Sequence, residues 1–213
     1  MKKSIILAAI LLLIGFQAKA QVIGGAGYLY SSEKTSGVDG TTPYHGAFVG
    51  ASYNIALGSG FGVAPGLYAS VLLHNVRAEA GSSKVGYNVA GSNREVALNV
   101  PVRANYSLDF GHDKSLLIYA GPIFQVGLLN TTTVTGSVSF LGLNYSDGDQ
   151  VNNYDPKNGT VNRFNIYLGG GVGIQLGDFI IHVGYDHSLL DVDKLDNYVT
   201  SRGLLSVGIG IDF

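Results

Sequence analysis

The sequence contains no cysteine and no tryptophan among its 213 residues, and only 13% of the residues are charged. The lack of cysteine excludes disulfides, thiolate metal sites and cysteine nucleophiles. The charged fraction is about half of the roughly 25% found in an average soluble domain. No apolar run reaches the roughly 20 residues that a membrane-spanning helix needs. The apolar residues must therefore be dispersed, as on strands with one apolar face.

Glycine is abundant, with 31 residues, and apolar residues alternate with small or polar ones over long stretches. Turn signals divide these stretches into eight candidate strands of 12 to 17 residues. Strands of soluble proteins cluster near about 5–6 residues, whereas a tilted membrane strand needs about 9–11. Length therefore favours a membrane protein. The candidates are residues 22–33, 43–57, 61–77, 94–109, 115–131, 162–177, 179–190 and 202–213.

Residues 1–20 have the layout of a secretory signal peptide. Lys2 and Lys3 form a basic start, an apolar core follows over 5–16, and Ala-Lys-Ala precedes Gln21. The alternative is a short membrane anchor, but twelve largely apolar residues are too few to span a bilayer. The pattern predicts export of the chain.

The mature chain, residues 21–213, is predicted to be one domain. Removing the signal peptide removes three lysines, so the formal net charge changes from −2 to −2 − 3 = −5. This acidic balance argues against a nucleic-acid partner.

The connections between the candidate strands alternate strictly between short and long, at about 9, 3, 16, 5, 30, 1 and 11 residues. Outer-membrane barrels have an even number of strands, short periplasmic turns and longer extracellular loops. The chain is therefore predicted to be all-β, as an eight-stranded antiparallel up-and-down transmembrane β-barrel in the outer membrane.

The stretch 165–190 is predicted to be a membrane hairpin, with its aliphatic face toward lipid and its glycines and polar residues inside. Closing the sheet satisfies every backbone N–H and C=O, which hydrocarbon cannot do. The alternative is a soluble lipocalin-like barrel with the faces exchanged. The polar face is sparse and rich in glycine, which makes it a poor aqueous surface.

Three stretches carry a resemblance to a known family: "LNVPVRANY" (98–106), "IYAGPIFQVGL" (118–128) and "LGGGVGIQLGDFIIHVGYDHSL" (168–189). They are similar to the mid-barrel strand, the Gly-Pro strand and the penultimate hairpin of the outer-membrane β-barrel family. This is the porin-like group that includes small OmpX- and OmpA-type barrels. The resemblance covers essentially all of 21–213. The absence of tryptophan is a departure, since aromatic girdles would have to consist of Tyr and Phe.

The final stretch "SVGIGIDF" is similar to the assembly signal of outer-membrane proteins. The residues that match are Ser206, Gly208, Ile211 and Phe213. The resemblance implies that the outer-membrane assembly machinery reads this strand and inserts the chain among outer-membrane lipids.

Polar residues on the predicted inner face indicate a network inside the barrel. We expect Glu95, Arg103, Arg163, His182 and Asp186 to form it. Eight strands leave an interior that side chains just fill, so a structural plug is the favoured interpretation. A narrow porin or channel for small solutes is the alternative.

The tripeptide "DHS" at 186–188 invites a catalytic interpretation, because some outer-membrane barrels are lipid-modifying enzymes. Neighbouring residues of a strand point to opposite faces. His182 and Asp186 share a face, but four residues place them roughly 13 Å apart. We therefore expect no enzyme, with partners on adjacent strands as the alternative.

The connection 132–161 is longer than the roughly 12–15 residues of ordinary loops and is the predicted functional element. Within it, "SFLGLNYS" is typical of a strand that extends above the membrane. It is predicted to bind a surface ligand, and a rigid extension without a ligand is the alternative. The oxygen-rich residues lack the EF-hand pattern with its closing Glu. We expect a solvated loop without metal or cofactor, with calcium as the alternative. These residues are Asp147, Asp149, Asn152, Asn153 and Asp155.

Overall fold

The computed structural model describes residues 20–81, 85–140, 143–157, 159–194 and 198–213. The predicted signal peptide lies outside these ranges apart from Ala20, where the first strand begins. In the described part of the chain, no helix is long and apolar enough to cross a membrane.

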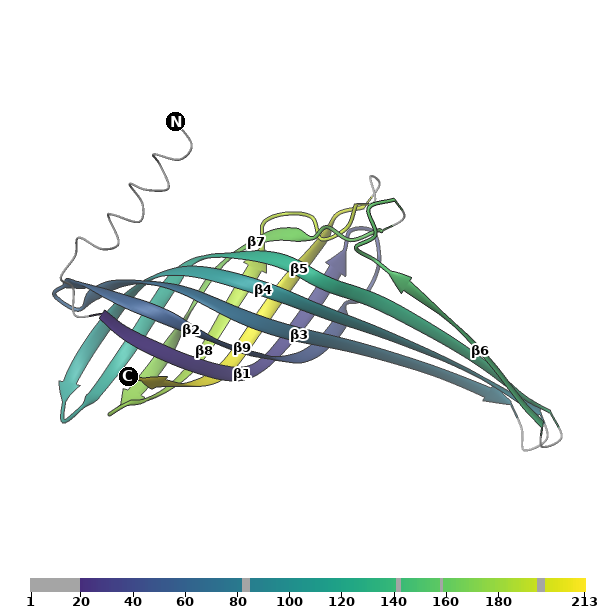
Figure 1. Ribbon diagram of the computed structural model, residues 1–213, viewed down its shortest axis with the longest axis horizontal. Coiled ribbons are helices and arrows are strands. Elements are labelled where there is room, and N and C mark those ends of the chain that lie inside the picture. The colour runs from purple at the N-terminus through teal and green to yellow at the C-terminus, as the bar shows by residue number, and fades with distance from the viewer. Residues whose placement is uncertain (1–19, 82–84, 141–142, 158, 195–197) are drawn as a thin grey trace.

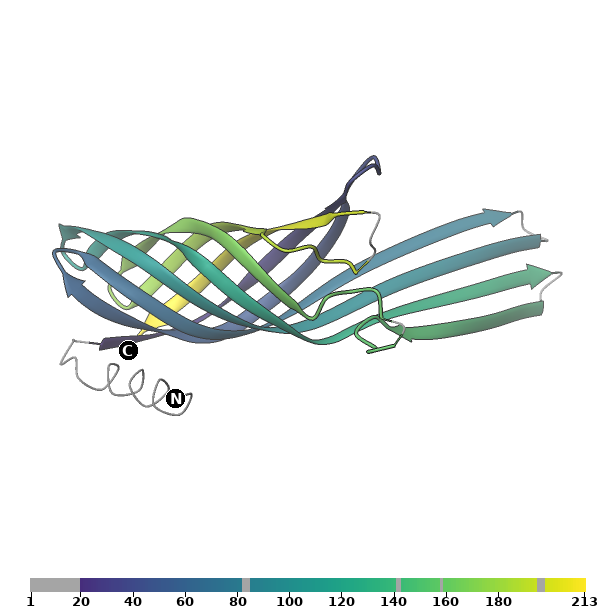
Figure 2. The same cartoon turned by 90° about the horizontal axis from the view of Figure 1, so that it is seen from above.

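The chain forms one antiparallel sheet that closes on itself (Figures 1 and 2). Pairing of β1 with β9 and of β4 with β5 completes a ring of eight strands, and β6 lies outside the ring against β5. The predicted eight-stranded antiparallel barrel is confirmed. The strands are β1 (Ala20–Thr35), β2 (Thr42–Gly58), β3 (Phe61–Gly81), β4 (Val85–Gly111), β5 (Lys114–Phe140), β6 (Leu143–Asn152), β7 (Phe164–Leu176), β8 (Phe179–Ser188) and β9 (Thr200–Asp212).

Strands β3, β4 and β5 are longer than predicted, and the interpretation of 78–93 as a loop is wrong. The β3–β4 ladder continues to the pair Gly81–Gly86, and the β4–β5 ladder continues to Val85–Phe140. Much of 132–161 is strand as well. In each ladder the backbone N–H and C=O groups of one strand bond to those of the next. This pairing does not require lipid, so the strands can continue beyond the membrane.

Four strands continue beyond the barrel as a flat sheet, which we call the fin. β2 pairs with β3 only as far as Leu73, and β7 pairs with β5 only as far as Val126, so neither edge of the fin pairs with a further strand among the described residues. Figures 1 and 2 show it extending well past the other strands. The prediction of one strand over "SFLGLNYS" is wrong, because residues 139–140 end β5 and residues 143–146 begin β6, which is antiparallel to it. Residues 141–142 lie outside the described residues. The fin consists of residues 74–81 of β3, 85–93 of β4, 131–140 of β5 and 143–152 of β6.

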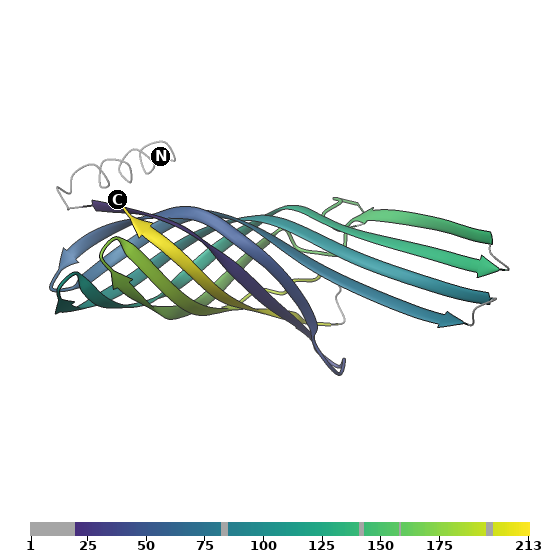
Figure 3. The same ribbon diagram turned by 90° about the horizontal axis from the view of Figure 1, so that it is seen from below.

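Three short turns lie at the opposite end of the barrel, which we call the turn end. They connect β2 to β3, β4 to β5 and β7 to β8, and positive φ angles occur at Ser59, His112 and Asp113. Both ends of the described chain are there too, since Phe213 N donates to Val22 O at 3.0 Å (Figure 3). The three connections that were predicted to be short therefore lie together at one end, whereas the predicted long loop 78–93 is mostly strand.

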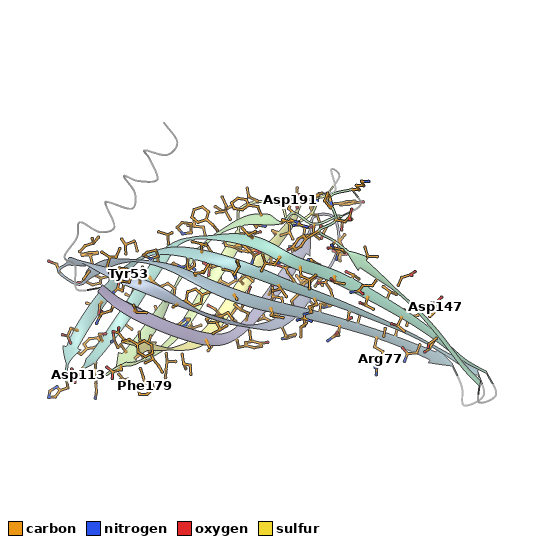
Figure 4. The ribbon with its side chains drawn as sticks, viewed as in Figure 1. Tyr53, Arg77, Asp113, Asp147, Phe179 and Asp191 are labelled. Carbon is orange, nitrogen blue, oxygen red and sulfur yellow. The ribbon has the colours of Figure 1, made fainter. Side chains whose placement is uncertain are left out.

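The outer face of the ring is aliphatic and the inner face is polar or glycine-rich. In β8, Ile181, Val183 and Tyr185 are exposed, whereas Asp186 and Ser188 are buried. Side chains such as Tyr53 and Phe179 project from the outside (Figure 4). The lipocalin-like alternative is wrong, because that fold needs its aliphatic face inside.

Candidate functional site

The interior toward the fin is closed by a buried ion pair between opposite walls. Arg202 on β9 donates from both terminal nitrogens to Glu95 on β4, Nη1 to Oε1 at 2.8 Å and Nη2 to Oε2 at 2.9 Å. Both residues are 2% exposed. A bidentate pair of this kind fixes geometry as well as charge. It ties together walls that are four places apart in the ring.

A second carboxylate also pairs with Arg202. Its Nε donates to Glu33 Oε1 at 2.8 Å, and Nη2 donates to the same oxygen. Tyr44 Oη donates to Glu33 Oε2 at 3.1 Å, and the Arg202 guanidinium lies 5.6 Å from the Tyr44 ring centre. Asn130 Nδ2 donates to Glu95 Oε2 at 3.2 Å. Each charged group therefore has several partners, as burial in a low-dielectric interior requires.

Apolar side chains pack directly beneath these charges. Leu29, Leu72 and Leu204 form one cluster with Tyr44 and the fully buried Tyr167. Tyr167 Oη donates to Gln125 at 3.2 Å, so its polar end is satisfied. We call Arg202, Glu95, Glu33, Tyr44 and Tyr167 the plug.

A second cross-barrel tie lies below the plug. Arg103 Nη2 donates to both oxygens of Asp186, at 2.7 and 2.8 Å, and Nη1 donates to the carbonyl of Gly121. The guanidinium lies 5.7 Å from the ring centre of Tyr119, whose Oη is 3.3 Å from His182 Nδ1. This tie again starts from β4 and ends on β8.

The predicted interior network divides into separate groups. Arg103 and Asp186 meet, and His182 reaches them through Tyr119, but Glu95 pairs with Arg202 instead. Arg163 does not belong to this network. The strand register had suggested an inward side chain, but β7 begins only at the next residue, and Arg163 is exposed at the rim.

Arg163 holds a rim tyrosine. Its Nε and Nη2 donate to Tyr154 O at 3.2 and 2.9 Å, and its guanidinium lies 5.5 Å from the Tyr154 ring centre. Tyr154 is buried, and burial and then the Glu95 carboxylate raise its pKa above the usual range. The phenol therefore stays protonated at physiological pH.

Neither Arg202 nor Glu33 is among the interior residues predicted from the sequence. The alternation of β9 could have identified Arg202. It lies four residues before the inward Ser206, and residues an even number of positions apart in a strand lie on the same face. Glu33 carries a weaker signal, since the alternation of the first strand is blurred. In the structure, Glu33 and Arg202 are directly opposite each other in the β1–β9 ladder.

The residues of "DHS" do not converge. Asp186 is held by Arg103, and Ser188 Oγ accepts a hydrogen bond from Arg202 N at 2.8 Å. His187 is exposed on the outer face.

The acidic residues of the long connection are also dispersed. Asp147 and Asp149 are exposed on β6, and Asn153 donates to Asn130 and Thr132. Asp155 Oδ1 accepts from Lys157 N. Across the described ranges, no group of three or more His, Asp or Glu residues is placed to hold a metal ion.

The predicted assembly strand is β9. Ser206 and Gly208 face the interior, whereas Ile211 and Phe213 are 41% and 80% exposed on the outside at the turn end. The strand closes the ring against β1. Recognition by the assembly machinery stays a prediction.

The closed ring leaves its backbone groups paired within the sheet, and its exterior is a continuous aliphatic surface. Hydrocarbon accepts only such a surface, with every backbone group satisfied internally. The protein is an outer-membrane β-barrel. The plug and the fin are therefore features of an outer-membrane barrel whose three short turns lie at the end opposite the fin.

No family model matches the sequence, and no curated protein matches it. Solved structures of outer-membrane barrels do match. Ail, the attachment invasion locus protein of Yersinia pestis, is 16% identical over 93% of this chain and 100% of that chain, with a TM-score of 0.38. Neisserial surface protein A is 12% identical over 91% and 97%, with a TM-score of 0.42. The outer membrane protease OmpT from Escherichia coli is 11% identical over 93% and 98%, with a TM-score of 0.30. At these identities the likeness concerns the fold alone.

Proposed function

We propose that this barrel is an interaction protein of the cell surface that presents its fin to a protein partner, and that it is neither a channel nor an enzyme. The observation that carries the proposal is an apolar face on the fin, in a part of the chain that lies beyond the membrane. Strands outside the bilayer have no lipid to cover such a face.

The apolar face consists of valines on adjacent strands. Val76, Gly91 and Val134 pair in one row across β3, β4 and β5. Val89 and Val151 lie two residues away from this row on the same side. The four valines are 42–53% exposed. We call this surface the valine face: Val76, Val89, Val134 and Val151, with Gly91 and Gly136.

The polarity of the sheet inverts where the barrel becomes the fin. The valine face continues the inner, polar face of the barrel, as the inward His74 two residues before Val76 shows. The opposite face of the fin carries Ser92, Thr131 and Thr133 in line with the lipid-facing side of the barrel. Membrane burial therefore does not explain the valines, whereas contact with another protein does.

The valine face is flat and has an acidic margin. Among the described residues, a Cβ built at Gly91 or Gly136 would meet no atom within 4 Å. Another backbone can therefore approach these positions closely. Asp147 and Asp149 on β6 pair with Gly136 and Val134, so they border the same face. The partner that fits is a protein surface with apolar side chains at its centre and basic residues on one side.

The plug supports a role other than transport. Arg202 and Glu95 meet across the interior and, like Tyr167, are buried, which supports an interior that side chains fill at this level. The separation of Asp186, His187 and Ser188 likewise supports a role other than catalysis.

Photo-crosslinking in living cells tests the proposed interaction. A photoreactive phenylalanine analogue at Val134 is expected to give a defined protein adduct, and Val76→Asn should abolish it. The matched control is the same analogue at Thr133, the next residue on the opposite face, which should give none. Equal adducts from both faces, or none from Val134, would overturn the proposal.

Conductance in planar bilayers tests the alternative. We expect no steady open level from the purified barrel. A steady, ion-selective level would instead identify a narrow porin, with the plug as its gate.

A further inference from the structure

The barrel interior between the plug and the turn end is partly empty. A partly open cavity of about 390 Å³ extends from Leu29 and Leu204, beneath the plug, to Gly58 and Gly60 at the β2–β3 turn. Pockets that bind small molecules span about 300–1,000 Å³. An apolar cavity of about 150 Å³ is already large enough for benzene. The volume therefore suits one small organic molecule.

The closed end of the cavity is apolar. Leu29, Leu72 and Leu204 line it, together with Phe48 and Ile123. These side chains also pack against Tyr44 and Tyr167 of the plug. Water in contact with such a surface gains little hydrogen bonding, so displacing it with an apolar group is favourable.

Between this apolar end and the turn end, the wall of the cavity carries several polar side chains. Tyr68, Tyr119 and His182 line the middle of the cavity, and Asn54 and Gln175 line the part near the turn end. Tyr119 and His182 are close enough for a mutual hydrogen bond at 3.3 Å. A ligand with one hydrogen-bonding group can exchange partners here while its apolar part lies deeper.

The charges on the wall favour an uncharged ligand. Arg103 is the only lysine or arginine that lines the cavity among the described residues, and Asp186 already binds it through both carboxylate oxygens. Asp212 adds a carboxylate near the turn end. An anion would meet no unpaired cation and one repelling carboxylate.

We propose that this cavity is a binding site for a small uncharged amphiphile, such as an aromatic or short-chain alcohol. The molecule enters from the periplasmic turn end, at the side of Asp113 and Phe179 in Figure 4, and places its apolar part against Leu29, Leu72 and Leu204. The plug makes this a site for binding and not for passage. The proposal does not depend on the fin.

Fluorine NMR of the mature protein in lipid nanodiscs tests the site, with 4-fluorobenzyl alcohol as the probe. Saturable broadening at one molecule per barrel is expected, beyond the partitioning measured in empty nanodiscs. 4-Fluorobenzoate should bind at least about tenfold more weakly, a difference of about 1.4 kcal/mol. Equal binding of both probes, or only the unsaturable partitioning of empty nanodiscs, would overturn the proposal.

Two variants separate the cavity from the lipid surface. Ser52→Phe places a ring in the cavity, whereas Ala51→Phe places the same ring on the lipid-facing side of the same strand. Ser52→Phe should abolish saturable binding and Ala51→Phe should retain it. Heat-modified gel mobility checks the folding of both, and Ala64→Leu, also in the cavity wall, replaces Ser52→Phe where that variant does not fold. Retained binding in the folded cavity variant would refute the site.

Discussion

Arg202 reaches Glu95 across the whole width of the barrel, from β9 to β4, with two hydrogen bonds of 2.8 and 2.9 Å. The Arg103–Asp186 pair starts from the same strand β4 and ends on β8. Strand β4 is therefore tied to the far wall at two levels. The apolar cluster packs against the first tie, and the second tie, Arg103–Asp186, is part of the cavity wall. The interior is therefore filled at the level of the first tie and partly open at the level of the second.

Glu95→Gln is expected to lower the stability of the barrel by about 1.5–3 kcal/mol, because it replaces a carboxylate that accepts two hydrogen bonds from the buried Arg202 guanidinium by an amide that cannot accept both. Glu33 still pairs with Arg202 and balances its charge, so the cost stays below the roughly 3–5 kcal/mol expected for a buried charge without a partner. The measurement is the urea midpoint at which the compact, unboiled gel band is lost from barrels in lipid vesicles.

The control is Asp39→Asn, which removes a carboxylate from an exposed loop position and should change the midpoint little. The double variant Glu95→Gln/Arg202→Met should lose more stability than Glu95→Gln, because it leaves the Glu33 carboxylate without its cation. Equal midpoints for Glu95→Gln and the unmodified barrel would contradict the importance of this pair.

The period-two alternation of the sequence was sufficient to predict the ring and its faces. Successive side chains of a strand point to opposite faces, so the alternate apolar residues of β7, such as Ile174, and of β8, such as Val183, were predicted to lie on the outer face. The ends of β3, β4 and β5 could not be predicted in this way, since the apolar residues there are separated by small and polar ones and the pairing is with a partner strand that the alternation does not identify.

The same distinction applies to the interior. Parity placed Arg103 and Asp186 inside, and the structure brings them together. The pairing of Glu95 with Arg202 depends on which walls face each other after closure, and residues 107 positions apart carry no local sign of it. Arg163 was wrongly predicted to lie inside. It precedes the first residue of β7, and the alternation of side chains between the two faces applies only within the strand.

The absence of native cysteine makes the topology directly testable. Asp147→Cys on the fin should react with a membrane-impermeant maleimide in intact cells. Asp113→Cys at a short turn should react only after the outer membrane is permeabilised. Both positions are exposed, so reactivity reports location. Labelling of Asp113→Cys alone in intact cells would reverse the orientation of the barrel.

Arginine substitutions on the outer face should show the depth of each position in the membrane. Val183 is the fifth of ten residues in β8 and pairs with Val172, so it lies near the midplane. Val183→Arg should cost about 2–4 kcal/mol, whereas Phe179→Arg at the first residue of the strand should cost about 0–1 kcal/mol. Both are compared by the urea midpoint. A larger cost at Phe179 would show that the hydrocarbon is centred nearer the turn end.

The ring of Tyr154 packs directly against the backbone of Gly127 on β5. A Cβ at Gly127 would lie 2.1 Å from Tyr154 Oη and 2.2 Å from its Cζ, well inside contact distance. Gly127→Ala must therefore displace Tyr154, and overpacking of this kind costs about 1–3 kcal/mol. The urea midpoint measures this loss as well.

Gly91→Ala is the matched control, because a Cβ there meets no atom within 4 Å among the described residues and restricts only the unfolded chain. Its midpoint should stay the same or rise slightly. Tyr154→Ala should make Gly127→Ala harmless, since the ring that clashes with the added methyl group is gone. If Gly127→Ala is as stable as Gly91→Ala in the unmodified background, then the Tyr154 ring does not pack on Gly127 in the membrane. The contact of Arg163 with that ring would then also differ from the one described.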